Sequence, residues 1–589
     1  MPSTLDLTRG FWAHLNIRRR RQLAILLMLM VFASFAEVLS LGAVLPFLGI
    51  LTTPDKVFDH PAVAPFLQWM NIQTAQELLL PITILFILAA LFAGSMRLLL
   101  LYVNTKLSFA IGADLSYEIY RRTLYQPYLV HVSRNSSEVI NGIAAKSAAV
   151  IQNLLMPILT LISSLMIFLT ILFALLSVDP LMSLIAFIGF SAIYGLVILT
   201  TRNRLALNSR RVAQESTQVI KVLQEGLGGI RDVLIDGSQA EYCKNFRLAD
   251  IPLRRAQASN IFIGGSPRFA AEALGMVFIA ILAYMMARQP GGVANAITTL
   301  GVLALGAQRL LPILQQSYSS IVGIRSGKSS LSDALDLLNQ PIDPTVYEGS
   351  NAVLQFTQSI RLQNVGFRYT QRGPWILRNL DLNIPRGGRV GFIGATGSGK
   401  STLIDIIMGL LLPTEGSVLI DGTPLSLSTQ RAWQRRIAHV PQSIYMSDAT
   451  IAENIAFGLM PDQIDSEQVR RAAHRAQVAD YIESLPNAYD TSVGERGVRL
   501  SGGQRQRIGI ARALYKQVEI IVLDEATSAL DNETERAVMD AVDSLSDEQT
   551  VLLIAHRLST LRGCDLVVEL SQGRVLRAGS YQEIVVGDK

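Results

Sequence analysis

The sequence predicts an α-helical membrane part with six spans, followed by a soluble α/β domain. Three observations lead to this fold class: apolar stretches confined to about the first 345 residues, a glycine-rich loop directly after a β-prone run, and a second apolar run that ends in two carboxylates. Half of the 589 residues are hydrophobic, only 17% are charged, and the mean hydropathy is +0.34. A chain of this length exceeds one domain.

Six apolar stretches are long enough to cross a membrane, which takes about 20 helical residues. Arg309 and Pro312 interrupt the last stretch, so the pattern does not define its ends. The six lie near residues 23–52, 80–104, 152–177, 181–201, 262–287 and 293–324.

Loop charge predicts the orientation of these spans. Arginines 18–21 precede the first span, and the long segments 105–150 and 202–260 are rich in Lys and Arg, whereas the opposite loops carry little beyond Lys56 and Arg288. By the positive-inside rule, both termini and the long segments are cytoplasmic. The net charge of +5 then requires no nucleic-acid partner. The first span is too long for a removed signal peptide and lacks a small-residue cleavage site.

A phosphate-binding loop is predicted after the β-prone run 389–393. Residues 394–401 match G-x-x-x-x-G-K-[ST], and the helix that follows would point its positive end at an anion. Glycine permits the backbone conformations that turn N–H groups inward. Lys400 would reach the β- and γ-phosphates, and Ser401 would ligate Mg²⁺. The candidate contact residues are Gly394, Ala395, Thr396, Gly397, Ser398, Gly399, Lys400, Ser401 and Thr402.

A second centre is predicted at the end of the apolar run 520–523. Such a run suits a parallel strand that is buried on both faces, and α/β sheets place ligands at the carboxyl ends of these strands. Asp524 would then belong to the Mg²⁺ shell, and Glu525 would be the general base for an attacking water. The alternative is a solvated Asp-Glu turn.

A third motif, Leu-Ser-Gly-Gly-Gln at 500–504, completes the pattern. Ser501, Gly502, Gly503 and Gln504 would place a hydroxyl and backbone N–H donors at a helix start, a second anion site. Together with the phosphate loop, this motif resembles the nucleotide-binding domain of ATP-binding cassette (ABC) transporters. The resemblance implies an ATPase that uses ATP and Mg²⁺. It also implies that the motif faces the γ-phosphate held by another subunit, in a homodimer or in a heterodimer with a related half-transporter.

Other roles follow from this resemblance alone. Tyr369 resembles the aromatic residue that stacks on adenine, and Gln442 resembles the glutamine that senses the γ-phosphate, the attacking water and the metal. Residues 528–531 match the loop that crosses to the opposite subunit. His556 matches the switch histidine; a lone histidine is more often structural, but its place after the run 550–554 favours the functional reading. The implied catalytic set is therefore Glu525, His556 and Gln442, and the implied metal set is Ser401, Gln442 and Asp524.

The six spans with long cytoplasmic segments resemble an exporter-type ABC membrane domain. Its helices extend into the cytoplasm and end in short coupling helices, for which residues 117–128 and 223–236 are the candidates; a simple bend in a long helix is the alternative. The predicted domains are a membrane domain at 1–325, a linker at 326–355 and an ATP-binding domain at 356–589.

The cargo has to be read from charges within the spans, because such charges are costly and mark function. Arg97, Arg268 and Arg309 lie on spans two, five and six, with Glu37 and Glu272 on spans one and five. Guanidinium groups suit phosphate geometry, so the arginines would grip an anionic head group in a central cavity. The alternatives are structural Arg–Glu ion pairs and arginines that reach to the membrane interface.

Patterns around residues 35–47, 266–268 and 309–312 resemble the bacterial lipid-linked oligosaccharide flippases, although less specifically than the cassette motifs do. That resemblance implies transport of polyprenyl-pyrophosphate-linked glycans to the outer leaflet of the bacterial cytoplasmic (inner) membrane. It also implies an amphipathic external helix within 61–79, where a plain loop is the alternative. An exporter of hydrophobic drugs or peptides is the competing function.

Overall fold

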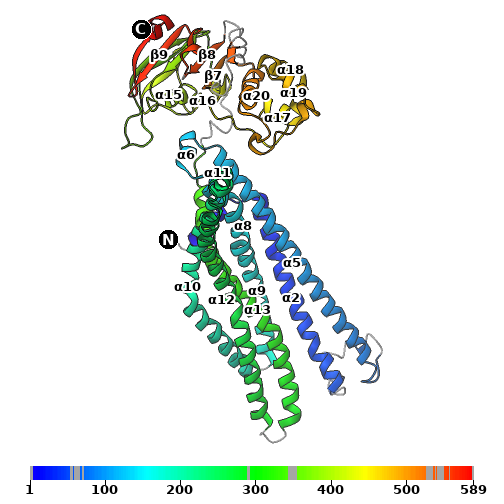
Figure 1. The fold of residues 1–589 in the computed structure, drawn as a ribbon. Coiled ribbons are helices and arrows are strands. Elements are labelled where there is room, and N and C mark those ends of the chain that lie inside the picture. The colour runs from blue at the N-terminus through cyan, green and yellow to red at the C-terminus, as the bar shows by residue number, and fades with distance from the viewer. Residues whose placement is uncertain are drawn as a thin grey trace. The chain divides into compact units, whose positions relative to one another are not determined.

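The computed structural model divides into a helical unit and an α/β unit (Figure 1). The helical unit comprises Met1–Leu124 and Arg134–Pro341, and the α/β unit comprises Tyr125–Ser133 and Ile342–Lys589. The structure describes residues 4–52, 58, 67–68, 72–178, 180–287, 292–342, 354–525, 535–536, 539, 549–555 and 557–586.

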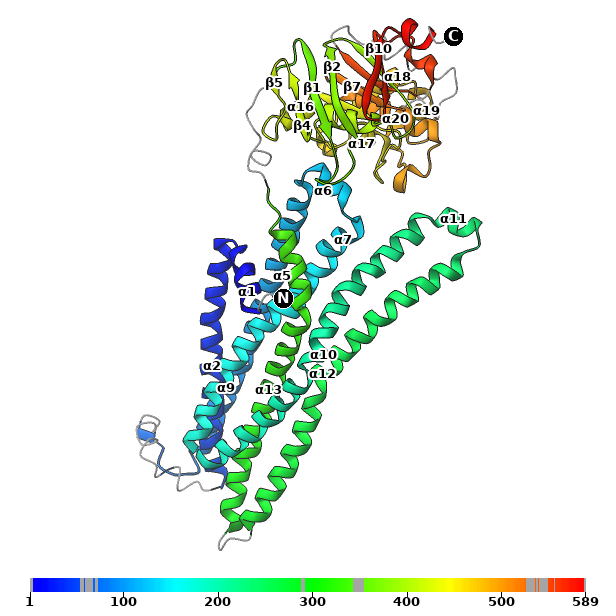
Figure 2. The same cartoon turned by 90° about the vertical axis from the view of Figure 1, so that its left-hand side faces the viewer.

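The helical unit is built from long helices that lie side by side (Figure 2). In the same view α10 and α12 form an antiparallel pair that turns at α11. The elements are α1 (Thr4–Ala13), α2 (Ile17–Thr52), α5 (Leu79–Leu124), α7 (Ser136–Asn141), the π-helix η1 (Gly142–Lys146), α8 (Ser147–Val150), the π-helix η2 (Ile151–Leu155), α9 (Met156–Val178), α10 (Pro180–Gly228), α11 (Ile230–Ile235), α12 (Gln239–Ala287) and α13 (Gly292–Leu338).

Three membrane-spanning segments meet the length and hydropathy of a span among the described residues: Ile17–Leu51, Leu79–Leu124 and Ser136–Phe173. The other predicted spans, 181–201, 262–287 and 293–324, fall within α10, α12 and α13, where many side chains lie outside the described residues. The count of six therefore stays a prediction. Large apolar side chains such as Phe35 and Leu91 are exposed on α2 and α5, as expected of a surface that lipid covers.

The candidate coupling segment 117–128 is mostly part of α5, and the short helix that follows begins at its last residue, Tyr128. Helix α5 continues to Leu124 because Ile119 and Thr123 are buried and because Glu118 pairs with Arg122 one turn on, at 2.7 Å. The next helix, α6 (Tyr128–Ser133), follows Pro127, and a proline favours a helix start. The break predicted within 223–236 falls at Gly229, between α10 and α11.

Residues 326–338, assigned to the linker by the sequence analysis, belong to α13 instead. Leu331, Ala334, Leu335 and Leu338 are buried in one cluster with Leu7 and other side chains from α1, α2 and α5. Burial of this apolar stripe keeps the segment helical up to Leu338, past the polar residues that suggested a linker. The amphipathic helix expected within 61–79 lies mostly outside the described residues.

The α/β unit contains two sheets. The first is antiparallel, in the order β2-β1-β4-β5, and the second has the order β10-β9-β3-β8-β7-β6, with all its neighbours parallel except β10 and β9. The strands are β1 (Ser359–Phe367), β2 (Leu377–Pro385), β3 (Arg389–Ile393), β4 (Glu415–Ile420), β5 (Thr423–Pro424), β6 (Ile437–Val440), β7 (Ile520–Asp524), β8 (Thr550–Ile554), β9 (Leu566–Ser571) and β10 (Arg574–Gly579).

Helices complete this unit, and α17, α18 and α20 pack on one another around a core of their own side chains and part of the second sheet. They are α6, α15 (Lys400–Ile407), α16 (Gln430–Gln434), η3 (Pro461–Gln463), α17 (Ile451–Ile455), α18 (Ser466–Arg475), α19 (Ala479–Glu483), η4 (Ala488–Asp490), η5 (Glu495–Gly497), α20 (Gly502–Tyr515), η6 (Leu558–Leu561) and η7 (Gln582–Val586).

Strand register gathers three loops at one edge of the second sheet. Phe392 of β3 pairs with Ile554 of β8, and Ile554 pairs with Asp524 of β7. These are parallel strands with fully apolar, buried centres, so their carboxyl ends meet at the same edge. The residues that follow these strands, Gly394, Glu525 and Ala555, consequently lie at one edge of the sheet.

Candidate ATP site and candidate substrate arginines

The loop after β3 has the backbone that a phosphate cradle needs. Gly394, Gly397 and Gly399 have φ values of +140°, +81° and +103°, a region that side chains disfavour. A Cβ on Gly394 would lie 2.2 Å from the carbonyl oxygen of Leu570, so only glycine fits there. Helix α15 begins at Lys400 and directs its positive end at the loop.

Two buried polar groups of this loop fit a phosphate. The Lys400 side chain is 8% exposed, and its Nζ donates to the carbonyl oxygens of Gly394 and Ala395 at 2.7 and 3.0 Å, which holds the ammonium over the loop. The Ser398 Oγ is buried without a hydrogen-bond partner among the described residues. An unsatisfied buried hydroxyl is costly, and a phosphate oxygen would satisfy it.

Glu525 and Gln442, predicted as catalytic residues, contact each other. The Gln442 Nε2 donates to the Glu525 Oε2 at 2.6 Å, although 83 positions separate them. Glu525 has φ +50°, an unusual value for a residue other than glycine, and its N–H donates to the carbonyl of Ile554 at 3.1 Å. This amide contact aims the carboxylate, and strained backbone of this kind gathers at functional sites.

The oxygen atoms available at this edge suit Mg²⁺. Because Gln442 uses its amide nitrogen on Glu525, its amide oxygen is left to accept or to ligate. Ser401 lies in the first turn of α15 and Asp524 ends β7, so the predicted metal set offers a hydroxyl, an amide oxygen and a carboxylate. Mg²⁺ prefers such ligands.

One acidic residue near this edge escaped the sequence analysis. Asp405 lies one helical turn after Ser401, and burial raises its pKa to about 6, with a further rise from the charge of Asp524. Its position in the sequence could have indicated it, because Asp405 is an isolated carboxyl among apolar residues and lies four residues after Ser401, on the same face of the helix.

The aromatic and helix-start residues are placed as follows. Tyr369 is 39% exposed, its ring packs edge-on against Phe367 at 5.0 Å, and its hydroxyl lies 3.3 Å from the Thr402 Oγ1. An exposed ring that another ring supports at its edge can stack on a base.

Ser501 caps α20: its Oγ accepts from the Gln504 N–H at 3.2 Å, and the Gln504 Oε1 accepts from the Ser501 N–H at 2.7 Å. The Ser501 hydroxyl proton and the N–H groups of Gly502 and Gly503 remain at the helix start as donors.

His556 and the segment 528–531 lie outside the described residues. The strand that precedes His556 is placed, because β8 lies between β3 and β7 and the Ala555 N–H donates to the Phe392 carbonyl at 3.3 Å.

The α/β unit also includes the segment Tyr125–Ser133. In the sequence this segment lies between α5 and α7 of the helical unit. The Arg431 guanidinium lies 4.8 Å from the ring centre of Tyr125. Burial raises the pKa of Tyr128, and the nearby Asp405 and Tyr369 add to the rise. Helix α6 therefore packs close to the helix that follows the phosphate loop.

Two of the three membrane arginines form ion pairs. Arg97 of α5 pairs with Glu37 of α2 at 3.1 Å, and Arg268 pairs with Glu272 one turn along α12 at 2.7 Å. Both arginine side chains stay 50% or more exposed, whereas Glu37 is 5% exposed. The ion-pair alternative thus describes these two residues in this structure. The side chain of Arg309 lies outside the described residues, so a cavity shared by all three stays a prediction.

Comparisons with known proteins cover both units. Residues 23–289 match the family described as ABC transporter transmembrane region, and residues 377–528 match the family described as ABC transporter. The ATP-dependent lipid A-core flippase of Chromohalobacter salexigens is 35% identical over 68% of this chain and 69% of its own. The heterocyst differentiation ATP-binding protein HepA of Nostoc sp. is 30% identical over 99% of this chain and 96% of its own.

A solved structure, a bacterial Atm1-family ABC exporter with ATP bound, matches 97% of this chain and 96% of its own, with a TM-score of 0.77 and 24% sequence identity. The match shows the exporter fold. The chain carries one membrane domain and one nucleotide-binding domain, which is half of a working transporter, so the fold implies a dimer. This protein therefore belongs to the ABC transporter family, as an integral membrane half-transporter of the exporter fold that couples ATP hydrolysis to transport.

Proposed function

We propose that this exporter moves a lipid with a phosphate-bearing saccharide head group, a lipid-linked oligosaccharide, from the cytoplasmic to the outer leaflet of the bacterial inner membrane. The observation that carries the proposal is the presence of two arginine side chains, Arg97 and Arg268, that lie on membrane helices and are half or more exposed. Charged groups are kept there only for function or for pairing. A relative named for flipping lipid A-core supports a lipid cargo.

The ion pairs fit this function as a resting arrangement. Each arginine has one carboxylate partner and keeps half or more of its side chain accessible, so an arriving pyrophosphate can share the guanidinium or replace the carboxylate. Glu37 and Glu272 would meanwhile hold each guanidinium in place. With Arg309 on α13, such groups would be drawn from three membrane helices.

We also propose how the ATP site works. Lys400, Ser398 and the loop N–H groups would hold the phosphates, and Tyr369 would stack on adenine. Glu525, aimed by Gln442, would accept the proton of the attacking water, and His556 would contact the γ-phosphate. Ser401, Gln442 and Asp524 would hold Mg²⁺, which neutralises the developing phosphate charge. Ser501, Gly502, Gly503 and Gln504 would serve the ATP held by the other chain of a homodimer.

Transport would follow from closure of the two ATP-binding domains. Helices α6 and α11 are the proposed contacts that carry this closure to the membrane helices. Helix α11 offers an exposed apolar tip for this purpose, with Leu234 at 58% and Ile235 at 73% exposure. Both chain termini would be cytoplasmic, as the loop charges predict.

The arginine hypothesis is tested in sealed vesicles that contain the purified dimer and a fluorescent short-chain polyprenyl-pyrophosphate disaccharide. Replacing Arg97, Arg268 and Arg309 together with Ala is expected to lower ATP-dependent translocation at least about tenfold while basal ATP hydrolysis stays within about twofold. The matched control is Arg254→Ala, which removes a mostly exposed arginine from α12 outside the predicted span.

Undiminished translocation by the triple variant would rule out the cavity. Stimulation of ATP hydrolysis by hydrophobic drugs or peptides, with none by the polyprenyl-pyrophosphate, would favour the competing exporter function.

A further inference from the structure

The carboxyl-terminal end of α13 is held by three neighbouring elements of the helical unit. From α5, the Arg122 Nη1 donates to the carbonyl oxygens of Leu338 and Gln340 at 2.5 and 3.2 Å. From the segment between α1 and α2, the His14 Nε2 lies 3.0 Å from the Asn339 Oδ1. From η1, the Lys146 Nζ donates to the Asp333 Oδ2 at 2.6 Å. After these residues the chain enters the ATP-binding unit at Ile342.

The Lys146–Asp333 ion pair has one buried partner. The Lys146 side chain is 8% exposed and that of Asp333 is 37% exposed. Burying an ammonium group is costly unless a carboxylate pairs with it, so the pairing is strongly specified. The pair lies on the wall of a cavity of about 630 Å³ between α7, η1, α10 and the end of α13.

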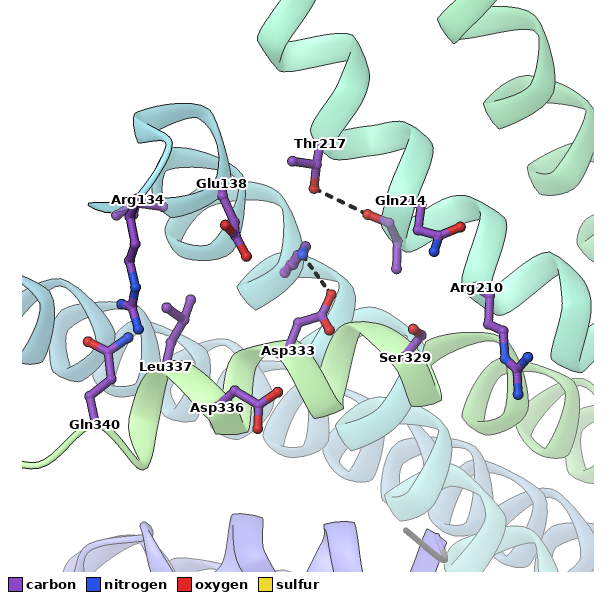
Figure 3. A pocket seen from close by; sticks show the side chains of 13 residues that line it. Arg134, Glu138, Arg210, Gln214, Thr217, Ser329, Asp333, Asp336, Leu337 and Gln340 are labelled. Carbon is purple, nitrogen blue, oxygen red and sulfur yellow. Dashed lines mark hydrogen bonds and ion pairs between the residues drawn. The ribbon is translucent and has the colours of Figure 1, made fainter. Parts of the chain in front are cut away.

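This cavity is polar and belongs entirely to the helical unit. Figure 3 shows Asp333 and Gln340 on α13 and its end, Glu138 on the opposite segment, and Thr217 on α10 around it. The Gln340 amide is 5% exposed, and neither of its polar atoms has a hydrogen-bond partner among the described residues. Charged and polar side chains contribute to its lining, so this cavity can admit water, and the end of α13 has space beside it.

From Gly323 to Leu337, α13 packs closely on the segment from Gly142 to Pro157. A Cβ on Gly327 would lie 2.8 Å from the Asn153 Cβ, one on Gly323 3.1 Å from the Pro157 Cγ, and one on Gly142 2.4 Å from the Leu337 Cδ1. These contacts and the ion pair share one antiparallel register: 142 faces 337, 146 faces 333, 153 faces 327 and 157 faces 323. The two segments therefore form one rigid pair.

Lys146 reaches this register from an unusual turn. It is the last residue of the π-helix η1, and the Ser147 Oγ donates to the carbonyl of Gly142 at 3.1 Å inside that turn. π-Helical turns are rare and often occur at functional sites. Here the turn places Gly142 and Lys146 on the face toward α13. Gly142 allows close packing against Leu337, and Lys146 forms the ion pair with Asp333.

We propose that Lys146 is a positioning residue for energy coupling. Its ion pair with Asp333 locks the end of α13 to η1, so motion of the ATP-binding unit passes to α9 and α13 as one body. Without the pair, the end of α13 shifts into the polar cavity, and ATP hydrolysis proceeds without moving the membrane helices. The proposal depends on ATP-driven transport and is independent of the cargo.

The test compares Lys146→Met with the wild type, as full-length dimers in lipid nanodiscs, by ATP hydrolysis and amide hydrogen exchange. Lys146→Met is expected to hydrolyse ATP within about twofold of wild type, while amides at 329–338 exchange at least about tenfold faster. Trapping with ATP and vanadate changes exchange at 310–328 in the wild type, and this change is lost in the variant. The matched control, Lys244→Met, removes an exposed pair with Glu241 and keeps the wild-type response.

Restoring a pair must restore coupling. Lys146→Arg, and Lys146→Asp combined with Asp333→Lys, are expected to recover the vanadate-dependent change at 310–328. The proposal is overturned if Lys146→Met responds to vanadate as the wild type does. It is equally overturned if hydrolysis and thermal stability fall together with the protection of these amides from exchange, since that marks a structural role only. Failure of both restored pairs to recover the response would overturn it as well.

Discussion

Glu525 combines a left-handed backbone, an amide contact from Gln442 and a place at the end of a buried strand. Together these features fix the direction of one carboxylate at the edge where the phosphate loop lies. A general base must lie within hydrogen-bond reach of the water that it activates, so direction matters more than acidity. At the scale of single residues, this site is therefore defined by geometry.

The first prediction concerns Glu525→Gln. The amide keeps the size of the side chain but cannot accept a proton, so ATP binding should persist while turnover falls by about 100-fold or more. Radiolabelled ATP retention and phosphate release measure the two effects. Near-normal turnover would remove Glu525 from the catalytic role.

The second prediction concerns Asp405, whose pKa is raised to about 6 from an ordinary value of 3.8. When folding raises the pKa of a carboxyl group, the folded protein favours the protonated form. The resulting contribution to stability is fully present at pH values below the pKa of the unfolded chain, and it is lost as the pH rises through the pKa of the folded protein. Asp405→Asn keeps the neutral form at every pH, so it should unfold at higher temperature than the wild type at pH 8. This difference should shrink toward pH 5.

Differential scanning fluorimetry of the nucleotide-free dimer in EDTA measures the unfolding temperatures of Asp405→Asn and wild type at each pH. Asp448→Asn, at an exposed position, is the control. A constant offset between variant and wild type across this range would contradict the assignment.

At the scale of elements, close packing of α13 depends on small residues. Gly323 and Gly327 let the helix approach Pro157 and Asn153, respectively. A β-carbon on Gly323 would lie 3.1 Å from Pro157, and one on Gly327 would lie 2.8 Å from Asn153. Glycine normally weakens a helix by about 1 kcal/mol relative to alanine, so its use here points to a packing requirement. Membrane helices commonly use small residues in this way.

The third prediction follows from this packing. Gly327→Ala should lower the midpoint of thermal unfolding by several degrees, since overpacking typically costs about 1–3 kcal/mol. The control is Gly94→Ala on α5, where nothing lies within 4 Å of the added carbon, and it should be neutral or slightly stabilising. Equal midpoints for the two variants would refute the packing argument.

At the scale of the whole molecule, one chain carries one phosphate loop and one Leu-Ser-Gly-Gly-Gln motif. In the proposed homodimer, each site takes its loop from one chain and its motif from the other. The arrangement of two defects over two chains then decides how many sites survive.

The fourth prediction uses differently tagged chains in a Glu525→Gln background. With Lys400→Ala on one chain and Ser501→Arg on the other, one complete site remains, and about one ATP per dimer should be trapped. With both changes on the same chain, neither site is complete and none should be trapped. The reverse result, with ATP trapped only when both changes are on the same chain, would show that the motif serves its own chain.

Much of the α/β unit was accessible from sequence because its signals are local. The run 389–393, the glycines at 394–399 and the start of a helix at Lys400 are consecutive, and backbone sterics alone dictate their conformations. The strand 520–524 was equally readable from its apolar run. The end of α13 was misjudged, because burial against α1, α2 and α5 held residues 326–338 in a helix despite their polar pattern.

The sequence by itself determined the membrane-plus-cassette class and the motif residues proposed for ATP, since these depend on order along the chain. Only the tertiary structure decided which distant groups meet: Gln442 with Glu525, Arg97 with Glu37, and Lys146 with Asp333. Helical periodicity says which residues share a face of one helix, but not the rotation and register of that helix against another. Those two quantities come from packing, and they place the buried charges.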